Sequence, residues 1–132
     1  MRRDDMTTLQ YVTRPSEHCR HITLIDPASQ SPDVAAERVM VAIDCGTSMI
    51  FVGGSTNTPD AIVHATCEAI QEALELRVFA ASQNPECDEE DSKIPVVLFP
   101  GGAHAFYPAA DAITYMSIMT STQQKFHVGD SV

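Results

Sequence analysis

The sequence has no tryptophan, few aromatic residues and few basic ones. Eight Lys and Arg residues stand against 18 Asp and Glu, so the formal net charge is −10. This balance argues against a nucleic-acid partner held by a basic patch. No apolar run approaches the ~20 residues that span a membrane, and the first six residues lack the apolar stretch of a signal peptide. We therefore expect a cytoplasmic protein without a transmembrane segment.

Cysteine chemistry is also poorly represented. The four cysteines, Cys19, Cys45, Cys67 and Cys87, lie far apart and form no Cys-x-x-Cys pair. Neither a zinc site nor a disulfide framework is indicated by this spacing. Cys45 and Cys67 fall within helical patterns, and we predict that both are buried as small apolar side chains.

What the sequence does contain is a strand followed by a helix. Residues 22–25 form a short apolar run that stops at Asp26-Pro27, as expected of a buried strand. Ser31-Pro32-Asp33 then offers a capping hydroxyl, a proline for the first helical position and an acid for the first turn. The predicted helix ends at Gly46, and its apolar face carries the following residues: Ala36, Val39, Met40 and Ile43.

The same unit occurs a second time. Residues 49–52 form another apolar strand, ended by Gly53-Gly54-Ser55, and Thr58-Pro59-Asp60 repeats the cap, proline and acid. The second helix is predicted to present an apolar face of four residues: Ile62, Val63, Ile70 and Leu74. Further strands are expected over residues 94–99 and 112–119. Strands alternating with helices at this spacing indicate right-handed βαβ units and a parallel sheet.

The expected fold class is α/β, with parallel βα repeats and about four strands. We divide the chain into an N-terminal extension at 1–20 and a barrel-like domain at 21–132, with an acidic surface excursion at 77–93. A complete (βα)₈ barrel usually needs at least ~200 residues, so the sequence suggests half of one. A flavodoxin-like module would need a fifth strand, for which there is no candidate. The outer edges of the first and last strands would be left unpaired and must be covered. We expect a homo-oligomer or a second half-barrel chain to cover them. A rearranged sheet or further sequence are the alternatives.

Chemistry in a parallel α/β fold is expected at the carboxyl ends of the strands. Asp26 ends the first strand, Gly53-Gly54-Ser55-Thr56 ends the second, and Pro100-Gly101-Gly102 ends the third. A carboxylate and a hydroxyl at neighbouring strand ends would suit Mg²⁺, which completes its shell with water and phosphate oxygens. Each motif alone is also common in ordinary turns. His104 could contact a substrate in the third loop, whereas His21, at the opposite end of the first strand, is expected to be structural.

Together these segments resemble the geranylgeranylglyceryl phosphate synthase family, including its bacterial heptaprenylglyceryl relatives. The motifs keep the family's order over most of residues 21–129, and the matching segments are residues 21–27, 51–56, 95–101, 110–113, 116–117 and 121. The resemblance implies a TIM-like barrel that transfers a prenyl group, such as geranylgeranyl, from its diphosphate to the 3-hydroxyl of sn-glycerol 1-phosphate. This reaction belongs to ether phospholipid biosynthesis.

The resemblance also implies site residues. It assigns Asp26 and Ser55 to Mg²⁺, and Gly53, Gly54, Thr56 and Gly101 to the diphosphate side of the substrate site. No residue of this chain is assigned to the glycerol phosphate site, because the loops that form it in the family follow later strands. No catalytic residue is assigned. The chain departs from the family at Gly102, where asparagine is usual. The sequence therefore predicts a truncated prenyltransferase; the alternative is a non-catalytic remnant, or a half-barrel that binds phosphate or protein.

Overall fold

A single parallel sheet organises the described part of the chain. The computed structural model describes residues 7–53, 58–86, 94–99 and 107–114. Its strands follow the order of the chain, so that each strand pairs in parallel with the next. They are β1 (Ile22–Ile25), β2 (Met49–Gly53), β3 (Val96–Phe99) and β4 (Ala112–Ile113). The predicted four-stranded α/β half-barrel is confirmed. The remainder of the expected fourth strand, 115–119, lies outside the described residues.

Helix α2 (Pro32–Asp44) begins where the sequence predicts. Ser31 is its N-cap, with a side-chain oxygen that accepts a hydrogen bond from the Val34 amide at 3.4 Å, and Pro32 occupies the first turn. Gly46 follows the helix with φ of +102°, the left-handed conformation that commonly ends helices. Its buried face is carried by Ala35, Val39 and Ile43.

Helix α3 (Asp60–Ser82) is longer than the sequence suggests. Pro59 is its N-cap residue, one position later than the predicted Thr58, and its carbonyl accepts hydrogen bonds from the Ile62 and Val63 amides. The helix continues to Ser82, so residues 77–82 are helical rather than part of the predicted surface excursion. Within the part of the chain that the structure describes, no helix is both long and apolar enough to cross a membrane.

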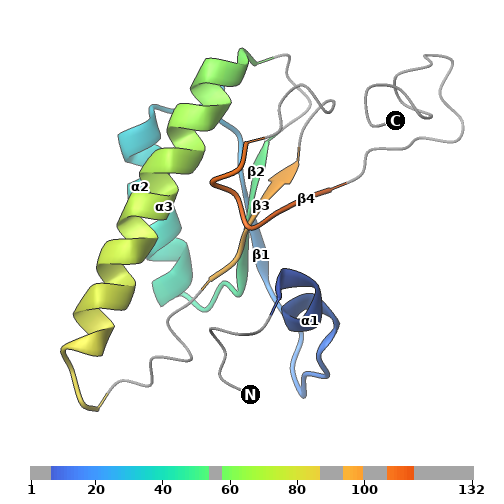
Figure 1. Ribbon diagram of the computed structural model, residues 1–132, viewed down its shortest axis with the longest axis vertical. Coiled ribbons are helices and arrows are strands. Elements are labelled where there is room, and N and C mark those ends of the chain that lie inside the picture. Colours follow the sequence, from blue (N-terminus) through green and yellow to red (C-terminus); the bar gives the residue numbers. More distant parts are fainter. Residues whose placement is uncertain (1–6, 54–57, 87–93, 100–106, 115–132) are drawn as a thin grey trace, which may run out of the picture.

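The main core lies between the sheet and helices α2 and α3, which cover one face of it (Figure 1). Strand side chains alternate between the two faces, so Ile25, Val52 and Leu98, which pair across the sheet, all point toward the helices. Val39 and Ile70 meet them from α2 and α3 with no exposed surface. Burying such a side chain contributes roughly 1.5–3 kcal/mol, so this layer fixes the sheet against the helices.

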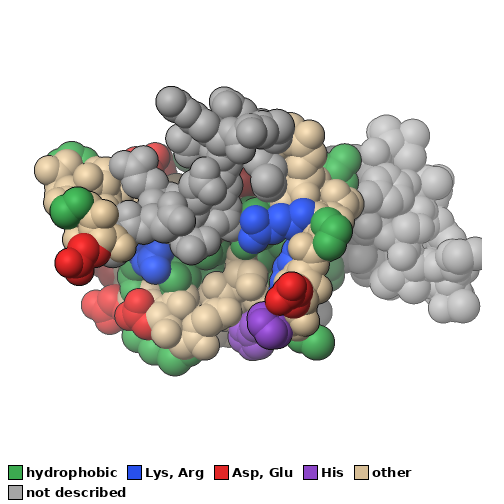
Figure 2. Space-filling model, turned by 90° about the horizontal axis from the view of Figure 1, so that it is seen from below, with side chains coloured by type: hydrophobic (Ala, Val, Ile, Leu, Met, Phe, Trp, Pro, Cys, Tyr) green, Lys and Arg blue, Asp and Glu red, His purple; other side chains and the backbone are tan. Residues whose placement is uncertain are grey.

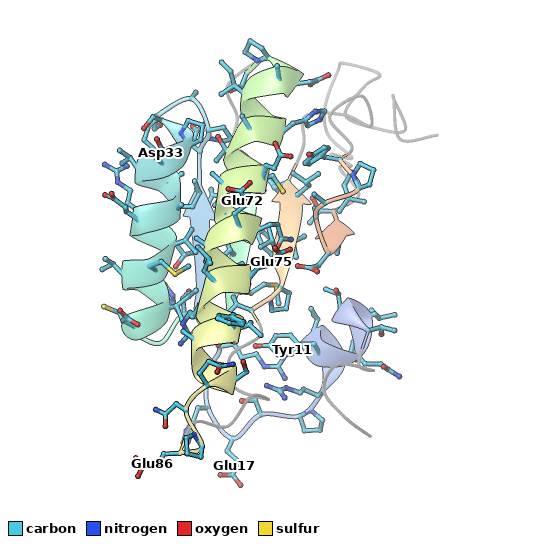
Figure 3. The ribbon with its side chains drawn as sticks, turned by 60° about the vertical axis from the view of Figure 1, so that its left-hand side comes forward. Tyr11, Glu17, Asp33, Glu72, Glu75 and Glu86 are labelled. Carbon is cyan, nitrogen blue, oxygen red and sulfur yellow. The ribbon has the colours of Figure 1, made fainter. Side chains whose placement is uncertain are left out.

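Among the described residues, the opposite face of the sheet is covered near the amino ends of its strands. Helix α1 (Thr8–Thr13), which lies in the predicted N-terminal extension, packs there through Tyr11 against Met49 and Val97. The Tyr11 hydroxyl donates to the Ser48 carbonyl at 2.9 Å. Figure 3 shows Tyr11 directed from α1 toward the end of the strands, and Figure 2 shows the basic side chains around this end. Residues before β1 are therefore integrated with the sheet.

Three predictions of burial were wrong. Residues 22–25 were expected to form a buried strand, but only Ile25 is buried, because Ile22 and Leu24 lie on the face of the sheet that points away from α2 and α3. Cys45 is exposed, because α2 ends at Asp44 and Cys45 is its C-cap, beyond the last turn that faces the core. Ile62 is exposed, because it lies outside the buried face of α3. The apolar residues of that face are Val63, Cys67, Ile70 and Leu74. Cys67 is buried as predicted. Ala36 and Met40 are half-buried, and the neighbouring Ala35 takes the fully buried position.

Candidate functional site

The carboxyl ends of β1, β2 and β3 meet at one edge of the sheet. The register pairs Ile25 with Val52, and Gly53 with Phe99, so the three strands finish within one residue of each other. In a parallel sheet this edge is where ligands bind, because the loops that follow the strands converge there. Of the predicted site residues, the structure describes two at this edge, Asp26 and Gly53.

Asp26 follows β1 directly and is half-buried. Continuing the strand's alternation by one residue places it on the face of Leu24, away from the helices. Its Oδ1 accepts a hydrogen bond from the Ala28 amide at 3.0 Å. Its carbonyl oxygen accepts from the Ser29 amide at 3.0 Å and from the Gln30 side-chain amide. The Asp-Pro turn thereby holds the carboxylate in one orientation at the end of the strand.

Gly53 is constrained by the neighbouring strand. Its φ is +149°, and a Cβ atom added to it would lie 2.0 Å from the Phe99 carbonyl oxygen. Only glycine can bring the end of β2 this close to the end of β3. Glycine at this position therefore has a structural cause, whatever ligand the following loop binds.

The other predicted site residues lie outside the described residues. They are Gly54, Ser55, Thr56, Gly101 and His104. The structure consequently does not test the pairing of Asp26 with Ser55. His21 is described, and its ring Nδ1 lies 2.9 Å from the Thr47 hydroxyl, at the amino end of the strands. That bond supports the predicted structural role of His21.

A groove beside α3 was not foreseen from the sequence. Its volume is about 690 Å³, within the usual range for small-molecule sites. It is lined by Gln71, Leu74, Glu75, Val78, Phe79, Ser82, Ile94, Ala109 and Asp111. In Figure 3 the labelled Glu75 lies along α3 beside the segment that leads into β4. The i, i+4 spacing of Leu74 and Val78 was the signal that the apolar face of α3 continues past residue 74.

The wall of this groove opposite α3 is fixed by hydrogen bonds. Asp111 Oδ2 accepts from the Val96 amide at 2.8 Å and from the Gln71 side-chain amide at 3.3 Å. The same Gln71 nitrogen donates to the Ala109 carbonyl at 2.7 Å. These bonds tie α3, the start of β3 and the segment before β4 to one another, so the groove has a defined shape.

Near the start of α3, the His64 ring stacks on the Tyr107 ring, with ring centroids 4.4 Å apart and planes inclined by 13°. The Nε2 atom of His64 is enclosed and has no hydrogen-bond partner in the described ranges. Desolvation and the nearby Glu68 carboxylate raise the pKa of the Tyr107 hydroxyl. This stack holds the segment before β4 against α3.

Comparisons with known proteins agree on one family. A model described as the PcrB family matches residues 14–131. The geranylgeranylglyceryl phosphate synthase of Thermoplasma volcanium is 35% identical over 128 residues, which are 96% of this chain and 44% of that protein. The synthase of Methanosarcina mazei is 33% identical over 112 residues, 85% of this chain and 38% of that protein. The chain thus spans less than half the length of these curated relatives.

Solved structures give the same result. The wild-type enzyme from Thermoplasma volcanium superposes with a TM-score of 0.75 at 34% identity, over 96% of this chain and 44% of that one. The (S)-3-O-geranylgeranylglyceryl phosphate synthase of Thermoplasma acidophilum, solved with its substrate sn-glycerol 1-phosphate, gives 0.74 at 29% identity. That match covers 95% of this chain and 44% of the other. The fold described above is therefore the arrangement that these enzymes use over the corresponding part of their chains.

Proposed function

Because the chain belongs to the PcrB family, we propose that it serves prenyl transfer from a prenyl diphosphate, such as geranylgeranyl diphosphate, to sn-glycerol 1-phosphate. The observation that carries the proposal is Asp26, held by its turn at the ligand-binding edge of a sheet that matches the synthases. In this reaction the 3-hydroxyl oxygen of the acceptor forms a bond to C1 of the prenyl chain. The bond from C1 to the diphosphate oxygen breaks, diphosphate leaves, and the hydroxyl proton is released. The product is an ether.

Asp26 suits a magnesium ligand, and we include Mg²⁺ in the proposal. Among the described residues no group of three or more His, Cys, Asp or Glu could hold a metal ion. Mg²⁺ does not need one, since it usually takes one or two carboxylates and completes its shell with waters and substrate phosphate oxygens. When bound, it would neutralise part of the charge on the departing diphosphate. Ser55 is the second proposed ligand.

The remaining proposed contacts are with the diphosphate. Gly54, Thr56 and Gly101 follow the ends of β2 and β3, where backbone amides can approach an anion closely. Gly53 belongs to the same proposed site, because it allows the ends of β2 and β3 to approach each other closely. The chain's own part in the chemistry is thus to fix the diphosphate beside Asp26.

The groove beside α3 has no part in this proposal. It lies on the helix side of the sheet, whereas Asp26 continues the face of Leu24, which points away from the helices.

The test is a transfer assay with radiolabelled geranylgeranyl diphosphate, sn-glycerol 1-phosphate and Mg²⁺, together with a direct measurement of prenyl diphosphate binding. We expect Asp26→Asn to weaken Mg²⁺-dependent binding about tenfold or more, as loss of a metal contact usually does. The control is Asp33→Asn, which changes an exposed acid in the first turn of α2. Absence of ether product at every protein concentration, together with equal binding by wild type and Asp26→Asn, would contradict the proposal.

A further inference from the structure

The loop between β1 and α2 is joined to the second turn of α2 by side-chain hydrogen bonds. Gln30 lies four residues after Asp26 and directly before Ser31, the N-cap of α2. Its Oε1 accepts a hydrogen bond from Arg38 Nη1 at 2.5 Å, and its Nε2 donates to the main-chain carbonyl of Asp26. Two consecutive hydrogen bonds therefore connect α2 to the residue that ends β1. In Figure 3 the label of Asp33 marks the first turn of α2, directly after this loop.

The two partners of Gln30 fix the orientation of its side-chain amide. A guanidinium group can only donate hydrogen bonds, and a main-chain carbonyl can only accept them. The amide oxygen of Gln30 must therefore face Arg38, and its nitrogen must face Asp26. The reversed orientation would set two donors against each other and two acceptors against each other. Gln30 is half-buried, so water cannot readily replace either partner.

Gln30 also completes the hydrogen bonding of the Asp26 carbonyl. A carbonyl oxygen has two lone pairs; the Ser29 amide uses one at 3.0 Å, and the Gln30 side chain uses the other. Pro27 follows, is buried, and restricts Asp26 to extended backbone. The peptide between Asp26 and Pro27 cannot rotate without breaking both bonds. The same turn presents the Ala28 amide to Asp26 Oδ1 at 3.0 Å.

We propose that Gln30 is a positioning residue for the Asp26 carboxylate, and that Arg38 fixes Gln30 in this role. Asp26 continues the face of Leu24, whereas α2 packs on the opposite face of the sheet. Gln30 and Arg38 therefore act through the turn and not on the ligand. The inference rests on the proposed function, in which Asp26 binds Mg²⁺. Groups that orient a metal ligand typically change metal affinity by about 10–100-fold when they are replaced.

The first test needs neither metal nor substrate. Nuclear magnetic resonance of the 132-residue chain records the amide proton of Ala28, and Asp26→Ala gives the position of that signal without its hydrogen-bond partner. We expect Gln30→Ala to move the signal upfield, toward this position. Gln71→Ala is the matched control, because Gln71 likewise donates to a main-chain carbonyl, that of Ala109. This control should leave the Ala28 signal where it is.

Variants of Arg38 test the other end of the same connection. Arg38 lies ten residues after Ala28 in the sequence, so replacing it has no direct effect of a sequence neighbour on the Ala28 amide. Arg38→Met removes the donor to Gln30 and should move the Ala28 signal in the same direction as Gln30→Ala, but less. Arg38→Lys keeps a donor and should restore the wild-type position. An Ala28 signal that stays in place in Gln30→Ala would overturn the proposal.

The second test measures the Mg²⁺ concentration that gives half-maximal binding of geranylgeranyl diphosphate. Gln30→Ala should raise this concentration about tenfold. Gln30→Glu should raise it as much, because a carboxylate can still accept from Arg38 but cannot donate to the Asp26 carbonyl. In a chain that already carries Asp26→Asn, Gln30→Ala should have no further effect, since it acts through that carboxylate. Equal losses in the two backgrounds would overturn the proposal.

Gln30 lies in a loop and Arg38 is exposed, so each variant should retain the fold. Far-ultraviolet circular dichroism verifies this, and Gln30→Met, of similar length, replaces Gln30→Ala if the helical signal is lost. Wild type that does not bind geranylgeranyl diphosphate with Mg²⁺ would contradict the proposed function. The Ala28 signal is measured without either ligand and would still decide whether Gln30 positions Asp26.

Discussion

Asp111 Oδ2 accepts a hydrogen bond from the Val96 amide at 2.8 Å, which joins the residue before β4 to the first residue of β3. The bond extends the ladder between the two strands, because the Asp111 amide in turn donates to the Val96 carbonyl at 2.8 Å. The short strand β4 is therefore positioned by a side chain as well as by its own backbone.

Replacing Asp111 by alanine should lower the free energy of unfolding by about 1–3 kcal/mol, the usual cost of leaving a buried amide without its partner. Urea unfolding followed by circular dichroism measures the change. Asp111→Asn keeps an acceptor oxygen and should lose less. Equal loss in the two variants would show that the charge of Asp111, rather than the bond to Val96, is what stabilises the strand.

Gly53→Ala tests the close approach of β2 and β3. The new Cβ would meet the Phe99 carbonyl at 2.0 Å, and the backbone strain adds to that overlap, so we expect a loss of about 2 kcal/mol or more. Gly46→Ala is the control, because Gly46 also has positive φ but nothing lies within 4 Å of an added Cβ. It should cost about 1 kcal/mol from conformation alone. Thermal unfolding of the two variants gives the comparison, and equal losses would show that steric overlap at Gly53 is unimportant.

The strands and the two long helices could be predicted because their signals are local. An apolar run stopped by Asp26-Pro27 and a Ser-Pro-Asp start for α2 depend on neighbouring residues only. The end of α3 was missed because acidic and polar residues near Ser82 suggest a loop. The helix continues to Ser82 although its last buried side chain is Leu74, so the apolar pattern used to predict the helix stops before the helix does.

The start of helix α1 is marked in the sequence by a capping box, which the apolar pattern alone does not reveal. Thr7 and Gln10 form a reciprocal capping box, in which each side chain bonds to the other residue's amide at 3.0–3.1 Å. The helix is six residues long with one buried side chain, too short for an apolar period to appear. The sequence correctly predicted that Asp26 follows β1. The predicted proximity of Asp26 to the loops after β2 and β3 stays a prediction, because the structure does not describe those loops.

Cys67 should be the least reactive of the described cysteines. Burial, followed by the negative charges of Asp111 and Glu68, raises the pKa of the Cys67 thiol to about 11. The thiolate is the reactive form, so Cys67 should resist a disulfide reagent at neutral pH while exposed Cys19 and Cys45 react. Mass spectrometry of labelled peptides before and after unfolding measures this, and equal labelling of Cys45 and Cys67 in the folded chain would contradict it.

The same pKa shift predicts how stability depends on pH. The folded chain holds the Cys67 proton more tightly than the unfolded chain, whose thiol has its ordinary pKa of 9.0. The contribution of Cys67 is therefore fully present below pH 9 and is lost as pH rises toward 11. Cys67→Ala should flatten the fall in unfolding free energy over this range. An unchanged slope would assign the fall to other groups.

Tyr11 joins α1 to the sheet in two ways that substitutions can separate. Tyr11→Phe removes the hydroxyl that donates to the Ser48 carbonyl but keeps the ring, and it should cost about 1 kcal/mol. Tyr11→Ala also removes the ring that packs on Met49 and Val97, so the loss should reach about 3 kcal/mol. Circular dichroism in urea is the suitable measurement, because the chain has no tryptophan. Leu9→Ala on the same helix, where Leu9 is 72% exposed, should change stability by no more than about 0.5 kcal/mol. If Tyr11→Ala behaved like Leu9→Ala, α1 would not stabilise the sheet.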